Sequence, residues 1–264
     1  MTNLSLRSNI NVQKYNSKDV YIYEDHRYIL NILYSFYLIN KKPLNLITFD
    51  KHDDFKDSNL NKKYFSEFHK KNPTIEEFWS TVEWKLSGLD DDWIKTGMEL
   101  NLINDIILID GEVGGNLTSY PSSIKDINNK THYIYRFPHI WNGLNKQGWL
   151  VDTAQTSRYK AAWDILDWNP NLRCINNPKN FIVDFDLDYF SYDLDNDVVA
   201  WPRDYINEKF NLEFGNISTK SILNDLFSKC EFITIAKESE CTGSIKENNK
   251  IMDMINYTLF KNKL

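Results

Sequence analysis

Cysteine is scarce in this sequence. Of its 264 residues, only Cys174, Cys230 and Cys241 are cysteines, and they are widely spaced without a Cys-x-x-Cys pair. An odd number of scattered cysteines fits neither a disulfide framework nor a zinc ribbon. We therefore expect the protein to work in a reducing compartment, which indicates a cytoplasmic location.

Long apolar runs are missing as well. No stretch approaches the roughly 18 uninterrupted apolar residues that a membrane-spanning helix needs. The first residues, Met-Thr-Asn-Leu-Ser-Leu-Arg, lack the apolar segment of a secretory signal peptide. The sequence therefore predicts neither a membrane partner nor secretion.

The sequence also has no long run of Lys and Arg, and its formal net charge is −6. Nucleic-acid binding needs a strong local basic patch, so we expect no nucleic-acid partner. The glycine-rich stretch at residues 110–115 is not spaced as a dinucleotide or phosphate-loop fingerprint, and its pattern indicates a turn.

What the sequence does contain is typical of a folded globular protein. Hydrophobic residues make up 42% and charged residues 26%, and an aromatic content of 14% speaks against disorder. No repeat, linker or shift in composition marks a second domain, so residues 1–264 are predicted to form a single domain. Residues 1–18 are polar and are predicted to be a loosely ordered lead-in.

Strand-like apolar runs alternate with apolar residues at helical spacing. We expect strands over 20–23, 44–49, 105–109, 132–137 and 232–236, with another beginning at 181. We expect helices over 28–39, 74–86, 93–102, 159–166, 218–229 and 247–260. Residues 56–72 are predicted to be an exposed loop and 189–197 an acidic loop. Strand, helix and strand in succession predict parallel strands, so the expected fold class is α/β, a three-layer α/β/α arrangement with a mainly parallel sheet.

The most informative stretch follows the strand at 44–49. Asp50, His52 and Asp54 alternate there, so an extended backbone would point all three side chains to one side. Carboxylate oxygens and a neutral imidazole suit a divalent ion such as manganese. The alternative is a solvated loop in which Asp forms turns or caps a helix.

Two further stretches favour the metal. Asp184, Asp186 and Asp188 alternate after an apolar run, and three like charges on one strand face repel each other unless a cation or protons compensate. A third run, Tyr-Ile-Tyr-Glu-Asp-His, ends at His26 just before a helical pattern. Because the carboxyl ends of parallel strands meet at one edge of a sheet, we expect these residues to share one metal site there.

In this order and between strands, the three stretches resemble the arginase/deacetylase (ureohydrolase-like) superfamily. The motifs are Glu24-Asp25-His26, Asp50-Lys-His52-Asp-Asp54 and Asp184-Phe-Asp186-Leu-Asp188-Tyr-Phe. More closely, they resemble the family of uncharacterised proteins that includes peptide arginases acting on ribosomally made peptides. The resemblance spans residues 20–245 and implies an arginase/deacetylase-like α/β/α fold.

The resemblance implies a site with two manganese ions. The matching ligands are His26, Asp50, His52, Asp54, Asp186 and Asp188. His26 and Asp54 match ligands of the first ion, and His52 matches a ligand of the second. Asp50 matches a bridging carboxylate, and Asp186 is the expected bridge of the later motif.

Three further acidic residues are expected near the substrate. Arginases usually carry a small residue where this chain has Asp184, so its role is open between metal ligand, supporting hydrogen-bond partner, substrate contact and structural residue. Glu238 and Glu240 both lie near the position at which an arginase carboxylate holds the guanidinium, and Glu240 is favoured. The expected catalytic residues are Glu240 and Asp54, with Asp54 or a histidine moving the proton. The other histidines available for this are His69, His132 and His139.

The implied activity is manganese-dependent hydrolysis of an arginine side chain to ornithine and urea. The loop residues that hold the α-amino and α-carboxylate groups of free arginine have no match here, so we expect the arginine to lie in a ribosomally made precursor peptide. Alternatives are a ureohydrolase acting on a small molecule, a one-zinc deacetylase-like amidohydrolase acting on acyl-lysine, and a non-catalytic metal-stabilised protein that binds a peptide. The presence of both His26 and Asp54 favours two ions over one. An oligomeric state does not follow from the sequence.

Overall fold

The chain folds around one mixed sheet of eight strands. The computed structural model describes residues 10–52, 54–110, 122–138, 180–195, 197–211, 213–214 and 217–264. The strand order is β1-β2-β12-β7-β3-β4-β6-β5. Their bounds are β1 (Asn11–Tyr15), β2 (Lys18–Tyr23), β3 (Leu44–Asp50), β4 (Ile103–Asp110), β5 (Ser122–Lys125), β6 (Thr131–Pro138), β7 (Phe181–Asp186) and β12 (Ile233–Ala236). The six inner strands run parallel, and β1 and β5 pair antiparallel at the two edges.

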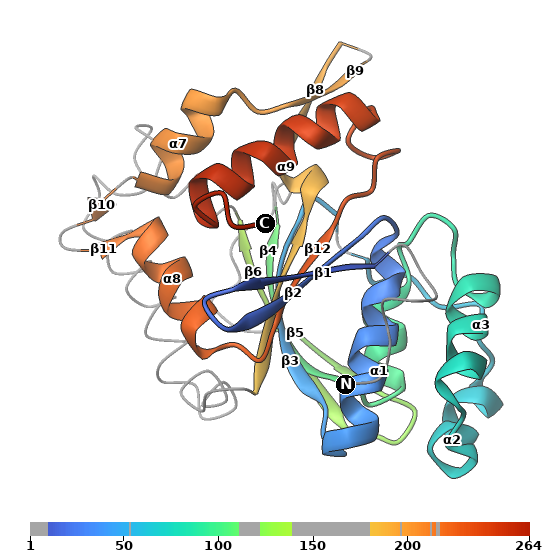
Figure 1. The fold of residues 1–264 in the computed structure, drawn as a ribbon. Helices are drawn as coiled ribbons and strands as arrows, with labels where there is room; N and C mark the ends of the chain where they lie inside the picture. The colour runs from blue at the N-terminus through green and yellow to red at the C-terminus, as the bar shows by residue number, and fades with distance from the viewer. Residues whose placement is uncertain are drawn as a thin grey trace.

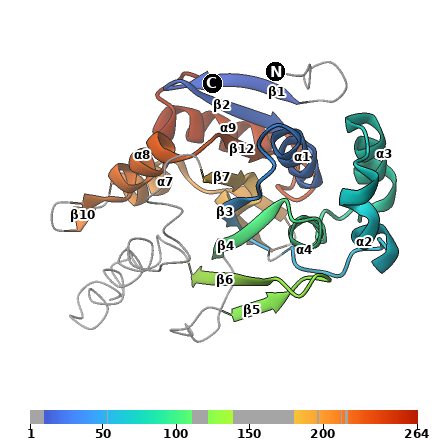
Figure 2. The same ribbon diagram turned by 90° about the horizontal axis from the view of Figure 1, so that it is seen from below.

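Helices cover both faces of this sheet (Figure 1). On one side lie α1 (Ile29–Asn40), α2 (Lys62–Lys71), α3 (Ile75–Lys85) and α4 (Trp93–Glu99), and on the other α7 (Arg203–Asn211), α8 (Thr219–Lys229) and α9 (Ile245–Leu259) (Figure 2). Each side buries its own apolar cluster against the sheet, with Leu33 and Met98 in one cluster and Leu226 and Ile255 in the other. The α/β class with a mainly parallel sheet flanked by helices is confirmed.

The central strands are apolar along their length because helices cover both of their faces. Every residue of β3, β7 and β12 is buried. Asp50 and Asp186 are the last residues of β3 and β7, so their carboxylates lie at the carboxyl edge of the sheet. His26 begins the short 3-10 helix η2 (His26–Tyr28) just beyond β2, at the same edge, as expected.

Most predicted elements are present with small shifts at their ends. Helix α3 begins with a capping box, since Glu77 N donates to Thr74 Oγ1 at 3.2 Å and Thr74 N donates to Glu77 Oε2 at 2.7 Å. The helix expected over 93–102 is shorter and ends at Glu99.

Two segments predicted to be irregular are ordered elements. The lead-in prediction is wrong for residues 11–15, because β1 pairs with β2 along its whole length. The loop prediction is wrong for 62–71, which form α2. Asn61 caps this helix by accepting a hydrogen bond from Tyr64 N, and Phe65 and Phe68 bury its inner face. Because lysines occupy the outer face of this helix, the segment is polar overall and its helical pattern is not apparent from the sequence.

The acidic loop predicted over 189–197 is wrong for most of its length. It overlaps the end of the 3-10 helix η3 (Leu187–Phe190) and a hairpin of β8 (Ser191–Leu194) and β9 (Asp197–Ala200). A smaller pair consists of β10 (Glu213–Phe214) and β11 (Ile217–Ser218). The helix predicted over 159–166 and the candidate His139 lie outside the described residues. Among the helices that the structure describes, none has the length and apolar content to cross a membrane.

Candidate metal centre

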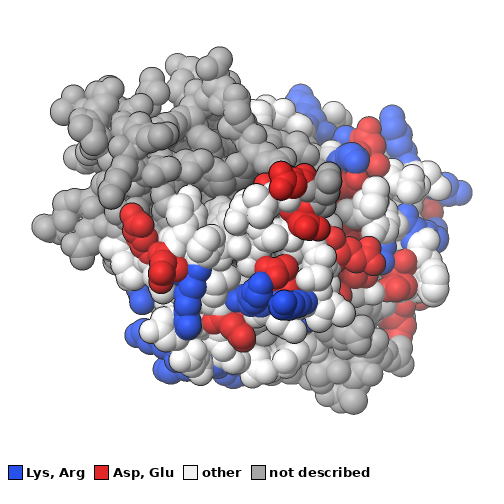
Figure 3. All heavy atoms as spheres, turned by 90° about the horizontal axis from the view of Figure 1, so that it is seen from above, with Lys and Arg blue, Asp and Glu red and all other residues white. Residues whose placement is uncertain are grey.

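The predicted ligand residues meet at the carboxyl edge of the sheet. They come from the ends of β2, β3 and β7 and from the residues that follow these strands. Figure 3 looks down on this edge, where Asp and Glu side chains lie across the described surface with Lys and Arg side chains between them. The buried carboxylates beneath this surface supply the negative charge that favours a cation.

The expected alternation holds for Asp184 and Asp186 in β7, but it is wrong beyond Asp50 and Asp186, where the backbone is no longer extended. β3 ends at Asp50, and Asp54 adopts a left-handed backbone conformation with φ of 43°. β7 ends at Asp186, and in η3 the backbone N–H of Asp188 donates to Asp186 Oδ1 at 3.1 Å. These turns, rather than an extended chain, bring the side chains together.

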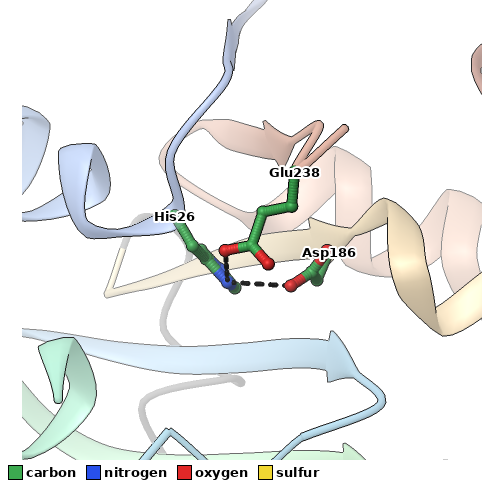
Figure 4. Close-up of side chains that lie close together, drawn as sticks. All are labelled: His26, Asp186 and Glu238. Carbon is green, nitrogen blue, oxygen red and sulfur yellow. Dashed lines mark ion pairs between the residues drawn. The ribbon is translucent and has the colours of Figure 1, made fainter. Parts of the chain in front are cut away.

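His26 lies at the centre of the cluster and is fully buried. Its Nδ1 atom lies 3.2 Å from Asp186, 3.5 Å from Asp54, 3.7 Å from Asp50 and 3.9 Å from Glu238, measured to the nearest carboxylate oxygen. Figure 4 shows Asp186 and Glu238 approaching the ring from β7 and from the segment after β12. No described residue forms a hydrogen bond of good geometry with this atom. A buried ring nitrogen surrounded by carboxylate oxygens but without a hydrogen bond fits a metal ligand.

The other ring nitrogen of His26 contacts Asp184. His26 Nε2 lies 2.8 Å from Asp184 Oδ2, which also accepts a hydrogen bond from Thr48 Oγ1 at 2.7 Å. Asp184 Oδ1 accepts one from Thr234 Oγ1 at 2.6 Å. Asp184 is completely buried beneath the imidazole, so the structure argues against the expected substrate contact at this residue.

His52 forms a second group beside the first. Its Nδ1 lies 2.8 Å from Asp188 Oδ2, and its backbone N–H donates to Asp50 Oδ1 at 2.7 Å. Half of the His52 side chain is exposed, so this group opens to solvent. The ligand atoms of Asp50, His52 and Asp188 lie within 4.8 Å of one another, as do those of His26, Asp50 and Asp54. Asp50 belongs to both groups and can bridge them.

Burial and neighbouring charges raise the pKa values of Asp50, Asp54 and Asp186. Burial, followed by repulsion from Asp54 and then Asp186, raises the pKa of Asp50 well above its ordinary value. Burial and then Asp188 raise the pKa of Asp186 to about 7, and burial raises that of Asp54 to about 6. The ionised carboxylates are therefore unfavourable in the metal-free protein, and a bound cation would remove that penalty.

The pKa values of the two imidazoles are also raised, which in their case favours the charged form. Burial lowers the pKa of His26, but the charges of Asp184 and Asp186 outweigh it and hold this pKa well above the ordinary value. The hydrogen bond to Asp188 raises the pKa of His52 to about 9. A metal ion would have to displace these protons, so metal affinity should fall in acid.

Trp93 holds two residues of the first group in place, a role that the sequence does not predict. Its Nε1 donates to Asp54 Oδ2 at 2.6 Å, and its ring centroid lies 4.4 Å from that of His26. Trp93 is fully buried at the first position of α4. No spacing rule links it to Asp54, which lies 39 residues earlier, so only the folded chain shows the contact.

The structure brings Glu238, and not Glu240, to the cluster. Glu238 is nearly buried and contacts the His26 side, whereas Glu240 is exposed. The backbone of Glu238 is left-handed, with φ of 41°, and its N–H donates to the carbonyl oxygen of Glu24 at 2.9 Å. The preference for Glu240 is therefore corrected in favour of Glu238.

The spare histidines that the structure describes do not join the cluster. His132 is buried near the start of β6, at the opposite edge of the sheet, where its Nδ1 lies 2.5 Å from the carbonyl oxygen of Asn104. His69 lies near the end of α2 against Tyr37. Neither is placed to transfer a proton at this site.

Within the described residues, the side chains that could hold a metal ion are His26, Asp50, His52, Asp54, Asp186, Asp188 and Glu238. No protein-family model and no curated protein matches this chain. The metal chemistry is therefore argued from the donor set. Imidazole nitrogens with several carboxylate oxygens suit a hard or borderline divalent ion, and no thiolate is among them.

We expect the metal-free protein to lose stability as the pH rises from about 6 to about 8.5. The folded-state pKa values of Asp186 and Glu238 are raised, so the folded state binds more protons than the unfolded state in this range. Stability linked to such groups is complete below the unfolded pKa and is lost as the pH rises through the folded pKa. Thermal unfolding after chelation should show Tm falling by on the order of 5 °C, and saturating Mn²⁺ should reverse the fall. A Tm that does not change with pH would contradict this crowding of charge.

Proposed function

We propose that this protein is a manganese-dependent hydrolase of the arginase/deacetylase type, which converts arginine side chains to ornithine and releases urea. The observation that carries the proposal is the pair of adjoining ligand groups, one around His26 and one around His52, that share Asp50. Their position at the carboxyl ends of parallel strands is where α/β proteins of this kind bind ligands.

In this proposal the two groups hold two ions. His26 and Asp54 would bind the first ion and His52 the second, and Asp50 would bridge them. Asp186 lies on the side of His26, at 3.2 Å, and would complete the coordination there. Two such ions would lower the pKa of a shared water and supply hydroxide at neutral pH.

The substrate side chain would be held by Glu238. Its nearly buried carboxylate can accept paired hydrogen bonds from a guanidinium, which aims the guanidinium carbon at the cluster. The bond between that carbon and the side-chain nitrogen breaks, and the water oxygen ends in urea. The leaving amine must gain a proton, and Asp54, anchored by the Trp93 indole, is the group proposed to move it.

We further propose that the arginine lies within a peptide. The sequence offers no match for loop residues that hold the free amino and carboxylate groups of arginine, and a peptide-bound arginine has neither group free. The acidic edge of the sheet would attract a cationic side chain from solution (Figure 3). A ribosomally made precursor peptide is the substrate class that fits both points.

The test is mass spectrometry of an arginine-containing peptide, ideally one encoded beside the gene, incubated with the manganese-loaded protein. The expected result is the mass change from arginine to ornithine with release of urea, absent from a chelated sample and from a peptide with Lys in place of Arg. If two ions are bound per chain but neither the peptide nor free arginine is converted, the proposal is overturned. Acyl-lysine and small guanidino compounds would then be the substrates to test.

A further inference from the structure

The buried carboxylate of Asp184 adjoins the metal centre but has no part in the proposed reaction. Thr48 and Thr234 stand directly opposite it in the register, one on each neighbouring strand. Both hydroxyls donate to Asp184, one to each carboxylate oxygen. Tyr23 adds a longer contact of 3.5 Å to Oδ1, and His26 Nε2 contacts Oδ2. Four side chains, from β3, β12 and β2 and from the residue His26 just beyond β2, thus converge on one carboxylate.

We propose that Asp184 is a positioning residue that fixes His26 in the tautomer with the proton on Nε2, so that Nδ1 offers its lone pair to the first metal ion. This inference rests on the metal centre of the proposed function and not on its substrate.

The hydrogen bonds around Asp184 decide which atom carries the proton. An ionised carboxylate can only accept hydrogen bonds, so His26 Nε2 must donate to it. Once a metal ion displaces the second proton, the neutral imidazole carries one N–H, on Nε2, which leaves Nδ1 as the acceptor atom. That atom is the one that faces Asp186, Asp54 and Asp50. The ring is therefore oriented before any ion binds.

The hydrogen bonds of Asp184 are shielded from solvent. Asp184, Thr48 and Thr234 are all fully buried, so water does not compete for these hydrogen bonds in the folded protein. The two threonine hydroxyls hold the carboxylate plane in place, which fixes the imidazole in turn. A carboxylate behind a ligating histidine also raises the basicity of the metal-binding nitrogen.

Asp184→Ala should weaken one ion selectively. It removes the acceptor for His26 Nε2, and loss of such a supporting partner lowers metal affinity by about 10- to 100-fold. The group around His52 does not contact Asp184, so the second ion should stay bound. A Mn²⁺ titration should therefore change from two tight sites to one tight and one weak site.

Two further variants separate positioning from structural damage. Asp184→Asn keeps an oxygen that can accept from His26 Nε2, and its amide nitrogen can donate to a threonine hydroxyl, so it should restore most of the affinity lost in Asp184→Ala. Thr234→Val removes the donor to Asp184 Oδ1, the carboxylate oxygen that His26 does not contact, so this variant should keep both ions. Thermal unfolding of each metal-free variant reports whether the fold is retained.

The tautomer can be read directly by NMR on the full chain. In protein labelled with ¹⁵N-histidine and loaded with diamagnetic Zn²⁺, the wild type should show His26 bound to metal through Nδ1 with a proton on Nε2, and His26→Gln assigns the signals. This spectrum decides the inference even if Asp184→Ala fails to fold.

Each outcome has a defined meaning. Coordination through Nε2, or an Asp184→Ala protein that binds both ions as the wild type does, overturns the inference. A wild type that binds ions with the expected tautomer but hydrolyses no arginine supports this inference and overturns only the proposed reaction. A wild type that binds no divalent ion overturns both.

Discussion

Asp186→Asn should abolish turnover and leave the metal-free protein at least as stable as the wild type at about pH 8. Asp186 Oδ2 lies 3.2 Å from His26 Nδ1, so the substitution removes a charged ligand from the first group while keeping the shape of the side chain. Burial and Asp188 raise the pKa of Asp186 to about 7, so its ionised form destabilises the folded protein at pH 8. A neutral amide removes that penalty.

The measurements are metal content after dialysis, Tm with and without Mn²⁺, and urea release. Loss of a supporting partner of a metal ligand costs about 10- to 100-fold, so loss of a ligand itself should cost more than about 10²-fold in activity. The variant should also lose most of the rise in Tm that Mn²⁺ gives the wild type.

His52→Ala is the matched variant for the second group. His52 is half exposed, so its removal should leave the fold intact and remove one of the two ions. Activity should be lost because the remaining ion cannot share a water with a second. A fully active variant at either residue would refute the metal assignment.

The strands and the edge that carries the site could be predicted because they follow from periodicity and burial. The apolar run that ends at Asp50 is typical of a strand covered on both faces, and the same holds for the run that ends at Asp186. Parallel strands place ligands at their carboxyl ends, so this rule also predicted that His26 lies at the same edge. These arguments need only local sequence and chain order.

The details inside the site could not be predicted because they depend on backbone turns and on contacts distant in sequence. Asp54 takes a left-handed backbone conformation, which the alternation argument excludes, and Glu238, to which that argument did not apply, takes one as well. The contact of Trp93 with Asp54 exists only after α4 packs against β4. Threonine in the apolar strands at positions 48 and 234 is a signal that could have indicated a buried polar partner for Asp184.

Glu238→Gln should lower kcat/KM for an arginine-containing peptide by about 10²- to 10³-fold, whereas Glu240→Gln should change it little. Removing one member of a buried, hydrogen-bonded charge pair costs about 2–5 kcal/mol, and each 1.4 kcal/mol is about tenfold. Glu238 is nearly buried beside His26, and Glu240, two residues later, is exposed. The two variants make the same change of charge in the same loop, so only their placement differs.

Metal content distinguishes the two roles that Glu238 can have. If it holds the guanidinium, as proposed, Glu238→Gln should bind both ions and lose only activity. If it is instead a ligand in the group with His26 and Asp186, the variant should lose an ion as well. An equal loss of activity in both variants would contradict the placement of Glu238 at the substrate, because screening by solvent makes an exposed carboxylate such as Glu240 a weak partner for a guanidinium.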